Sequence, residues 1–251
     1  MRALAFDTST DACTVALAVD GATLEDHRVE RQAHARLLLP MIGGLLDEAG
    51  IGLGDLDGIV FGRGPGGFTG VRIATAAAQG LALASDLGVV GVSTLGAIAQ
   101  GCLREHGDRR VRVVVDARMG ELYVGEYLVG ADAGRTGAVD GGEAEGGGAG
   151  GGASVPIVVP VGIEAVVAPG DAGIDAAPAD AAFAGSGIER FPEAFAGIEP
   201  GRLRPGRLPR ATDLLALAAA RLAAGELDDP ADAIPVYLRD RVALTEAERG
   251  V

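Results

Sequence analysis

The sequence predicts an α/β protein that is built from two related units, and three features indicate this class. Residues 60–83 (VFGRGPGGFTGVRIATAAAQGLAL) read as a buried strand, a glycine loop and an alanine-rich helix in succession. An apolar strand at residues 3–6 ends in Asp7, and a second one at residues 111–115 ends in Asp116. Each of these two strands is followed by a short polar or glycine turn and by a further strand, which favours a duplicated fold.

The first unit is expected over residues 1–104, with the element order βββαβαβα. Its strands are short apolar runs bounded by turn residues. They are expected at residues 3–6, 13–19, 24–29, 56–61 and 89–92. Its helices are expected at residues 32–49, with a kink or break at Pro40, from residue 69 onward, and at 94–103 with Ser93 or Thr94 as the cap.

The second unit is expected over residues 105–209, and residues 210–251 are expected to form a helix and tail that pack back on the first unit. The second unit begins with the strand at 111–115 and a hairpin at 122–129, and further elements are expected as a strand at 157–159, a short helix from Ile163 and a strand at 182–184. Residues 141–152 hold eight glycines in twelve positions, which predicts a flexible surface insertion.

The C-terminal segment has the pattern of one helix followed by extended chain. An amphipathic helix is expected at residues 211–224, capped by Thr212 and ended by Gly225. Residues 234–239 read as an extended segment, and the chain is expected to fray from Thr245.

The composition is that of a globular, acidic protein. The chain has 251 residues, of which 48% are hydrophobic, and a formal net charge of −14, so any RNA contact is expected to come through a partner. All 21 basic residues are arginine, which excludes Schiff-base chemistry and a phosphate-binding lysine. Cys13 and Cys102 are expected in the core, and with no long apolar run or signal peptide the protein is expected in the cytoplasm, without a membrane partner.

The glycine loop allows three interpretations. Gly62, Gly67 and Thr69 fit a P-loop, but Phe68 stands where the phosphate-binding lysine belongs. The same glycines together with Gly64 fit the dinucleotide fingerprint, but the next strand ends without the acid that binds the ribose. We therefore favour a tight strand-to-helix turn whose glycines let two backbones pack closely.

Two helices of the first unit carry more apolar surface than one face needs. In the helix at 32–49 the apolar residues cover well over half of the circumference: Leu37, Leu38, Leu39, Met41, Ile42, Leu45 and Leu46. In the helix from residue 69 small residues recur at helical spacing: Ala74, Thr75, Ala77, Ala78 and Leu81. The pattern favours a second face covered by another helix or another chain, although a buried helix explains it as well.

Few side chains suit catalysis. The turn after the first strand carries Asp7, Thr8 and Ser9, which suit a phosphate or metal cradle but are equally typical of a polar turn. If Asp7 and Asp116 face each other across a cleft, they suit Mg²⁺ with a nucleotide. However, the bulky residues 118–119 stand where a phosphate-binding hairpin needs small ones, which makes ATP hydrolysis doubtful. The histidines lie apart and no serine lies in a G-x-S-x-G motif, so neither a zinc site nor a serine hydrolase is expected.

Five stretches together resemble one known family. They are AFDTSTDACTVAL, GRGPGGFTGVRIATAAAQGLA, GVSTLGAIA, VVVDARMGELYVGEY and PVYLR, and they are similar to the bacterial TsaB (YeaZ) family of tRNA threonylcarbamoyladenosine synthesis. The likeness is strong over residues 1–130, and the G-P-G-x-F-T-G-x-R motif at 64–72 is specific. The glycine-rich insertion departs from the family pattern.

The resemblance implies two actin/Hsp70-like (ASKHA, ribonuclease H-like) subdomains with mixed sheets flanked by helices. It also implies that this chain is an accessory subunit without catalytic residues, metal or tightly bound cofactor. The paralogue TsaD, which carries a metal-binding H-x-x-x-H, transfers the threonylcarbamoyl group from threonylcarbamoyl-AMP to N6 of the adenosine 3′ to the anticodon, in tRNAs that read codons starting with A. The ATPase TsaE is also needed, so ATP and threonylcarbamoyl-AMP are used by the complex.

The resemblance further implies pairing with TsaD, or with a second copy, through helices of the first subdomain. The residues that we expect to bind the partner are Leu37, Leu38, Met41, Leu45, Phe68, Arg72, Thr75, Ala78 and Gln79. On this view Leu38→Asp or Ala78→Arg disrupts the interface and leaves the fold intact. The residues of a possible vestigial nucleotide site are Asp7, Thr8, Ser9 and Asp116.

Two alternative functions remain open from the residues. An ASKHA-type ATPase or small-molecule kinase would use Asp7 and Asp116. A glycoprotease-like peptidase is disfavoured, because such an enzyme needs metal ligands that the sequence lacks.

Overall fold

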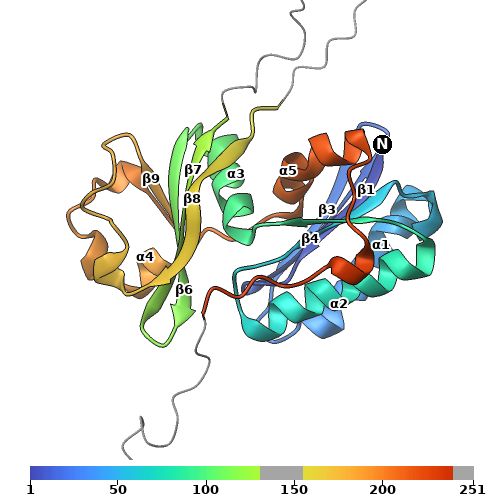
Figure 1. Cartoon of the computed structure of the whole chain (residues 1–251), viewed down its shortest axis with the longest axis horizontal. Helices are drawn as coiled ribbons and strands as arrows, with labels where there is room; N and C mark the ends of the chain where they lie inside the picture. Colours follow the sequence, from blue (N-terminus) through green and yellow to red (C-terminus); the bar gives the residue numbers. More distant parts are fainter. Residues whose placement is uncertain (131–154, 240–251) are drawn as a thin grey trace, which may run out of the picture.

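The computed structural model describes residues 1–130 and 155–239, which form two lobes (Figure 1). Each lobe contains a five-stranded mixed sheet. The glycine-rich insertion expected at 141–152 and the end expected to fray from Thr245 lie outside the described residues. Among the helices that the structure describes, none is both long enough and apolar enough to span a bilayer.

The first lobe is built on the sheet β3-β2-β1-β4-β5. Its strands are β1 (Arg2–Asp7), β2 (Ala12–Val19), β3 (Ala22–Val29), β4 (Gly58–Gly62) and β5 (Val89–Val92). The first three strands are antiparallel neighbours, and β4 and β5 run parallel to β1. One face of the sheet is covered by helices α1 (His34–Ala49) and α2 (Phe68–Ser85), and the other by α5 (Ala211–Ala224).

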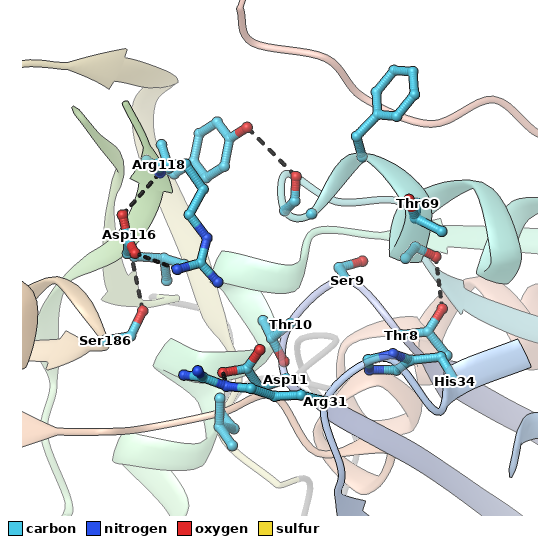
Figure 2. Close-up of a pocket in the computed structure, with 18 of the residues that line it drawn as sticks. Thr8, Ser9, Thr10, Asp11, Arg31, His34, Thr69, Asp116, Arg118 and Ser186 are labelled. Carbon is cyan, nitrogen blue, oxygen red and sulfur yellow. Dashed lines mark hydrogen bonds and ion pairs between the residues drawn. The ribbon is translucent and has the colours of Figure 1, made fainter. Parts of the chain in front are cut away.

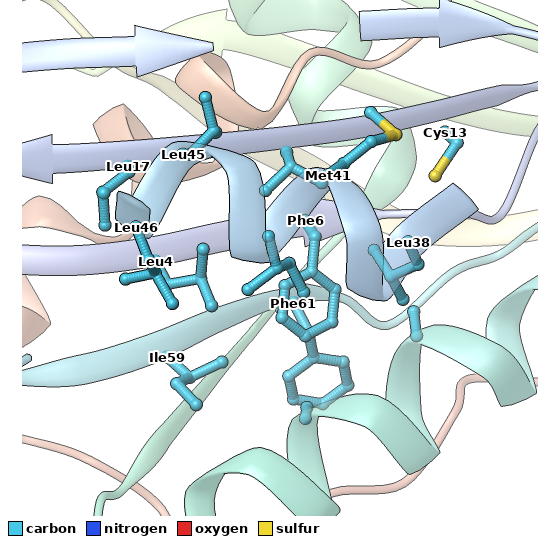
Figure 3. Packing of buried hydrophobic residues seen from close by; sticks show 14 of the residues in the cluster. Leu4, Phe6, Cys13, Leu17, Leu38, Met41, Leu45, Leu46, Ile59 and Phe61 are labelled. Atoms are coloured by element: carbon cyan, nitrogen blue, oxygen red, sulfur yellow. The ribbon is translucent and has the colours of Figure 1, made fainter. Parts of the chain in front are cut away.

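Alternation along β1 divides the first lobe into two cores. Leu4 and Phe6 point into the cluster beneath α1 and α2 (Figure 3). Ala3 and Ala5 face α5 on the other side of the sheet. Large side chains fill the first core and small ones let α5 lie close to the sheet. Burial of each large side chain contributes about 1.5–3 kcal/mol. Cys13 lies in the first core as a free thiol, as predicted.

The second lobe repeats this topology with the sheet β10-β9-β6-β7-β8. Its strands are β6 (Arg110–Arg118), β7 (Glu121–Val129), β8 (Val158–Val167), β9 (Ala182–Gly185) and β10 (Leu203–Pro205). As in the first lobe, each neighbouring pair is antiparallel on one side of the central strand, β6 with β7 and β7 with β8. On the other side each neighbouring pair is parallel, β6 with β9 and β9 with β10. Helix α3 (Thr94–His106) covers one face, and the short helix α4 (Gly187–Arg190) lies on the other.

Short 3-10 turns connect these elements. They are η1 (Leu53–Asp55), η2 (Pro169–Asp171), η3 (Pro192–Phe195), η4 (Pro200–Arg202) and η5 (Pro230–Asp232). The prediction of two related α/β units with mixed sheets flanked by helices is confirmed. The order βββαβαβα is also confirmed along the chain, although its last helix, α3, covers the sheet of the second lobe. Ser93 caps α3 as predicted, because its Oγ accepts a hydrogen bond from the Gly96 N–H at 3.2 Å.

Two local predictions are wrong. Ile163 lies inside the long strand β8, not at the start of a helix, because this run of valines pairs along β7. Thr212 does not cap α5, whose N-cap is Arg210 without a side-chain bond. Instead, the first N–H of α5, at Ala211, donates to Thr14 Oγ1 of β2 at 3.0 Å, so the cap comes from the sheet.

Helices α3 and α5 lie against each other between the two sheets (Figure 1). The Arg104 side chain of α3 makes a two-pronged ion pair with Asp213 of α5, with N···O distances of 2.8 and 3.0 Å. A second link comes from Glu164, which lies where the pairing of β8 with β7 is irregular. Its carboxylate accepts hydrogen bonds from the hydroxyls of Ser93 and Tyr127. Side chains from both lobes therefore hold the lobes together.

Candidate functional site

A cleft of about 1040 Å³ lies between the two lobes. Its walls are the turn after β1, the glycine loop at the start of α2, the β6–β7 turn and residues 237–239 of the C-terminal segment (Figure 2). This is where the carboxyl ends of the two equivalent central strands, β1 and β6, approach each other. The cleft is the place where a duplicated fold of this kind has room for a ligand.

Asp7 ends β1 but does not line the cleft. Its side chain is fully buried, where one carboxylate oxygen accepts the Ser9 N–H at 2.5 Å and the other accepts the Thr94 hydroxyl at 2.7 Å. A Cβ atom on Gly62 would lie 1.8 Å from the same carboxylate, so the glycine backbone covers it. Asp7 therefore supports the turn from below and is closed off from a ligand in the cleft.

The glycine loop packs directly on the turn after β1. The Gly67 N–H donates to the Ser9 carbonyl at 2.7 Å, and the Thr8 hydroxyl donates to the Gly70 carbonyl at 2.7 Å. A Cβ atom on Gly66 would lie 2.3 Å from the Ser9 carbonyl oxygen, and one on Gly70 would lie 1.9 Å from that of Thr8. The prediction of a tight turn with two closely packed backbones is confirmed.

The same packing occupies the place of a phosphate cradle. Ser9 is 2% exposed and its Oγ has no hydrogen-bond partner among the described residues. The Thr8 hydroxyl is already used by Gly70. Neither hydroxyl is therefore free to bind a phosphate in the cleft, because that of Thr8 is bonded and that of Ser9 is buried.

Asp116 lies in the cleft wall, near the end of β6 (Figure 2). Its carboxylate accepts the backbone N–H of Arg118 at 2.8 Å and pairs with the Arg118 guanidinium at 3.0 Å. Arg118 and Met119 both adopt left-handed backbone conformations, with φ of 63° and 54°. Because Asp7 is buried beneath the turn, Asp7 and Asp116 do not face each other across the cleft.

The cleft carries arginines that are paired with acids. Arg31 contacts Asp11 at 3.0 Å, and Arg239 contacts Glu121. With Arg118, three of the cations around the cleft thus have their charge neutralised inside the chain.

Several residues expected to bind a partner belong to the core. Leu37, Leu38, Met41 and Leu45 are 2–6% exposed and pack between α1 and the sheet (Figure 3). Thr75 and Ala78 are also buried, on the inner side of α2. The expectation that these six residues meet a partner is therefore corrected. The apolar residues of α1 form one broad stripe, which packs against both the sheet and helix α2.

This burial also changes the expected effect of two substitutions. Leu38→Asp and Ala78→Arg would place a charge in the core, so they are expected to unfold the chain and not to report on an interface.

The other three expected partner residues, Phe68, Arg72 and Gln79, lie at the surface of α2 and contact the C-terminal segment. The Gln79 side-chain N–H donates to the Ala233 carbonyl at 2.9 Å, and Arg72 Nε donates to the Tyr237 hydroxyl at 2.8 Å. Phe68 is 48% exposed. The sequence predicted an extended segment here but not what it contacts, since Arg72 and Tyr237 are 165 positions apart.

The outward surfaces of α1 and α2 contain glycines that the chain itself does not require. A Cβ atom on Gly43, Gly44 or Gly80 would meet no atom within 4 Å. A glycine inside a helix costs about 1 kcal/mol relative to alanine. The sequence shows these glycines in the middle of predicted helices, but only the structure shows that they lie on the outward side.

We expect Asp7→Asn to change how stability depends on pH. Burial raises the pKa of Asp7 above its ordinary value of 3.8, although hydrogen bonds from Thr94 and Ser9 oppose this shift. In the unfolded chain the carboxyl ionises near its ordinary pKa, so the wild-type protein loses stability as the pH rises from there through the folded pKa. The asparagine does not titrate, and the variant should gain stability relative to wild type between about pH 4 and pH 7 in urea unfolding.

The control for this prediction is Asp47→Asn, at an exposed position of α1 where the side chain stays in water in both states. The gain in stability with rising pH should be larger for Asp7→Asn than for Asp47→Asn. A difference for Asp7→Asn that is flat, or that falls as the pH rises, would show that the buried carboxyl is ionised in the folded protein.

Comparison with known proteins relates the chain to threonylcarbamoyladenosine synthesis. The family model TsaD, tRNA N6-adenosine threonylcarbamoyltransferase, matches residues 28–140. The tRNA threonylcarbamoyladenosine biosynthesis protein TsaB of Escherichia coli K12 is 37% identical over 246 residues, which cover 97% of this chain and 96% of that protein. The TsaB protein of Haemophilus influenzae is 44% identical over 125 residues, or 50% of this chain and 53% of that protein.

Solved structures agree with this relationship. The structure described as YeaZ from Pseudomonas aeruginosa has a TM-score of 0.77 and 39% identity, and the match covers 94% of this chain and 99% of that one. A second structure from Pseudomonas aeruginosa, described as an uncharacterized protein with similarity to peptidase YEAZ, has a TM-score of 0.80 and 41% identity, with 95% and 99% coverage.

Proposed function

Because the chain belongs to the TsaB (YeaZ) family of tRNA threonylcarbamoyladenosine biosynthesis proteins, we propose that it is a non-catalytic subunit of the complex that makes this modification. Its partner is TsaD, which transfers the threonylcarbamoyl group from threonylcarbamoyl-AMP to N6 of the adenosine 3′ to the anticodon, and TsaE completes the complex. The chain holds no tightly bound cofactor, and it is the complex as a whole that uses ATP and threonylcarbamoyl-AMP.

One observation supports the absence of catalysis more than any other. The backbone of Gly66 and Gly70 occupies the space above the turn after β1. It lies so close that a Cβ atom on Gly66 or Gly70 would come within 2.3 or 1.9 Å, respectively, of a carbonyl oxygen of that turn. A nucleotide polyphosphate needs free N–H groups and hydroxyls at such a turn. Here the Thr8 hydroxyl and the Gly67 N–H are consumed within the chain.

The outward side of α1 and α2 supports a role in binding another protein. Gly43, Gly44 and Gly80 open this surface to close approach, and small residues are what allow two helices to pack at short distance. The family model of the transferase matches residues 28–140, a range that contains both helices. TsaD, the proposed partner, therefore has a region similar to the part of this chain that carries α1 and α2.

The charge of the chain supports indirect contact with tRNA. With a formal net charge of −14, the chain repels a polyanion at long range. We therefore expect tRNA to reach this subunit only as part of the complex. A tRNA-modifying role also favours the cytoplasm.

The decisive experiment mixes the purified chain with TsaD of the same organism on a size-exclusion column with light scattering. We expect a stoichiometric complex, no ATP hydrolysis by the chain alone, and loss of tRNA modification in a reconstituted reaction from which the chain is omitted. ATP turnover by the chain alone would favour the ATPase or kinase alternative, and metal-dependent peptide cleavage would favour the peptidase.

The glycines of the helix surface allow a matched test of where TsaD binds. Gly80→Leu is expected to leave the thermal midpoint near that of wild type and to weaken TsaD binding at least about tenfold, because the new side chain points into open space where a partner helix would lie. Gly197→Leu, at a glycine of the second lobe that also faces open space, is the control and should bind normally. Equal affinities for the two variants would exclude the α2 surface as the interface.

A further inference from the structure

The C-terminal segment is fixed on helix α2 at several points. Ala233 is 4% exposed, and its carbonyl accepts the Gln79 side-chain N–H at 2.9 Å. Further along, the Val236 N–H donates to the Arg63 carbonyl at 2.8 Å. Residues 233–238 therefore form part of the same continuous surface as the N-terminal half of α2.

Arg72 is held in a defined position at the centre of this surface. Its guanidinium carbon lies 3.6 Å from the centre of the Phe68 ring and 5.7 Å from that of Tyr237. Its Nε donates to the Tyr237 hydroxyl at 2.8 Å. The two ring centres are 6.0 Å apart, so the cation is fixed by both aromatic side chains.

The outer nitrogens of Arg72 are free to bind another molecule. Among residues 1–130 and 155–239 no acid lies within ion-pair distance of Arg72, and its side chain makes a hydrogen bond only through Nε. The residue is exposed. Two terminal nitrogens in a fixed plane suit a carboxylate, which accepts two parallel hydrogen bonds from a guanidinium.

Apolar side chains surround this cation. Phe68 and Tyr237 are each 48% exposed and Ile234 is 69% exposed. A shallow hollow of about 410 Å³ between α2 and the segment is lined by Ala76 and Pro235 among others. At protein interfaces, arginine and tyrosine residues that are fixed in place and surrounded by apolar side chains often dominate the binding energy.

We propose that the exposed side chains of residues 68–80 and 233–238 form one docking surface, the α2–tail surface, on which Arg72 receives a carboxylate of TsaD. The inference rests on the proposed function, because TsaD is the partner proposed there. It adds the C-terminal segment to the interface and assigns the chemistry of the partner group.

The charge of the surface favours a different protein over a second copy of this chain. Arg72 is the only charged residue of α2, and residues 233–238 carry no charge. In a two-fold symmetric dimer centred on this surface, the same patch faces itself. Arg72 would then meet an uncharged surface with a second Arg72 nearby, whereas a different protein supplies the missing acid.

Titration calorimetry of TsaD with the full-length chain tests the proposal. Arg72→Ala should weaken binding by about 10- to 30-fold, as truncation of a central arginine does. Arg72→Lys should recover only part of the loss, because a lysine keeps the charge but not the planar fork. Tyr237→Phe, which keeps the ring and removes the hydroxyl that holds Nε, should weaken binding by a few-fold.

The matched control is Arg109→Ala, at an exposed arginine just before β6 in the second lobe, which should bind within twofold of wild type. Raising the salt concentration should weaken the wild-type complex more than the Arg72→Ala complex. Circular dichroism and thermal unfolding of each variant show whether it is folded. Tyr237→Phe tests the same surface while leaving the arginine in place.

The outcomes separate this proposal from the one it rests on. If wild-type chain does not bind TsaD, the proposed function is wrong and this inference fails with it. If wild type binds but Arg72→Ala and Tyr237→Phe both bind like Arg109→Ala, only the α2–tail surface is excluded. If Arg72→Ala abolishes self-association in sedimentation and leaves TsaD affinity unchanged, the surface belongs to a second copy and the proposal is also overturned.

Discussion

Gly70→Ala is expected to destabilise the folded chain by about 3 kcal/mol or more, at the upper end of what overpacking costs. A Cβ atom at this position would lie 1.9 Å from the backbone carbonyl oxygen of Thr8, which belongs to a turn that is itself held by hydrogen bonds. Neither atom is the end of a flexible side chain. Helix α2 would therefore have to move away from β1, which would open the core between them.

The control lies on the same helix. Gly80→Ala adds a methyl group where nothing lies within 4 Å, so the higher helix propensity of alanine should stabilise the chain by about 1 kcal/mol. The two substitutions are chemically identical and should move stability in opposite directions in urea unfolding. Stability of Gly70→Ala at or above the wild-type level would contradict the close packing of the loop on the turn.

Arg104→Ala is expected to cost about 3 to 5 kcal/mol, because it leaves a buried carboxylate without its counter-ion. The Asp213 side chain is 2% exposed, and both of its oxygens bind the Arg104 guanidinium at 2.8 and 3.0 Å. The pair joins α3, which covers the second sheet, to α5, which covers the first. Its loss should therefore weaken the contact between the two lobes.

The pH dependence distinguishes this effect from a simple loss of packing. Burial raises the pKa of Asp213 above its ordinary value of 3.8, and Arg104 opposes this shift. Without the arginine the folded pKa rises further, so the penalty should be largest above that pKa and should shrink as the pH falls toward 3.8 and both states bind the proton. Urea unfolding at about pH 7 and about pH 4.5 measures the difference.

Two further variants complete this test. The double variant Arg104→Met/Asp213→Leu should recover most of the lost stability, because it removes both charges and keeps the volume. Arg28→Ala breaks an ion pair with Asp26 whose arginine is 49% exposed, and should cost less than about 1 kcal/mol. A similar loss for Arg28→Ala and Arg104→Ala, or a pH-independent loss for Arg104→Ala, would contradict a buried charge effect.

Both variants act on contacts that join separate elements of the fold. The glycine loop holds α2 to β1 in the first lobe, and the ion pair of Arg104 and Asp213 holds α3 to α5 between the lobes. The first contact fixes the start of α2 on the turn after β1, and the second fixes the helix of one sheet on the helix of the other. This agrees with a subunit whose proposed use is to present a surface.

Local patterns predicted most of the secondary structure and the duplication. Short apolar runs ended by Asp7 and Asp116 appeared as the two equivalent central strands β1 and β6. The error at Ile163 arose because a valine-rich run has no local feature that separates an edge strand from a buried helix turn, and pairing with β7 decided it.

The candidate site was less predictable. The motif 64–72 identified the tight turn, but it did not show that Asp7 lies beneath this turn and away from the cleft. The apolar surplus at Leu37, Leu38, Met41 and Leu45 was read as a second face, whereas α2 and the sheet cover all four. The hydropathy pattern shows how many apolar residues a helix carries, but it does not show how many neighbouring elements cover them.

By itself, the sequence determined most of the strands and helices, that the pattern occurs twice, and that glycines crowd one strand-to-helix turn. These properties depend on side-chain periodicity and on backbone freedom, which are local and can be read along the chain. Only the tertiary structure decided that Gly70 meets Thr8, that Asp213 pairs with Arg104, and that residues 233–238 extend the surface of α2. The physical reason is that these contacts join residues far apart in sequence, and their geometry depends on how two sheets and their helices pack together.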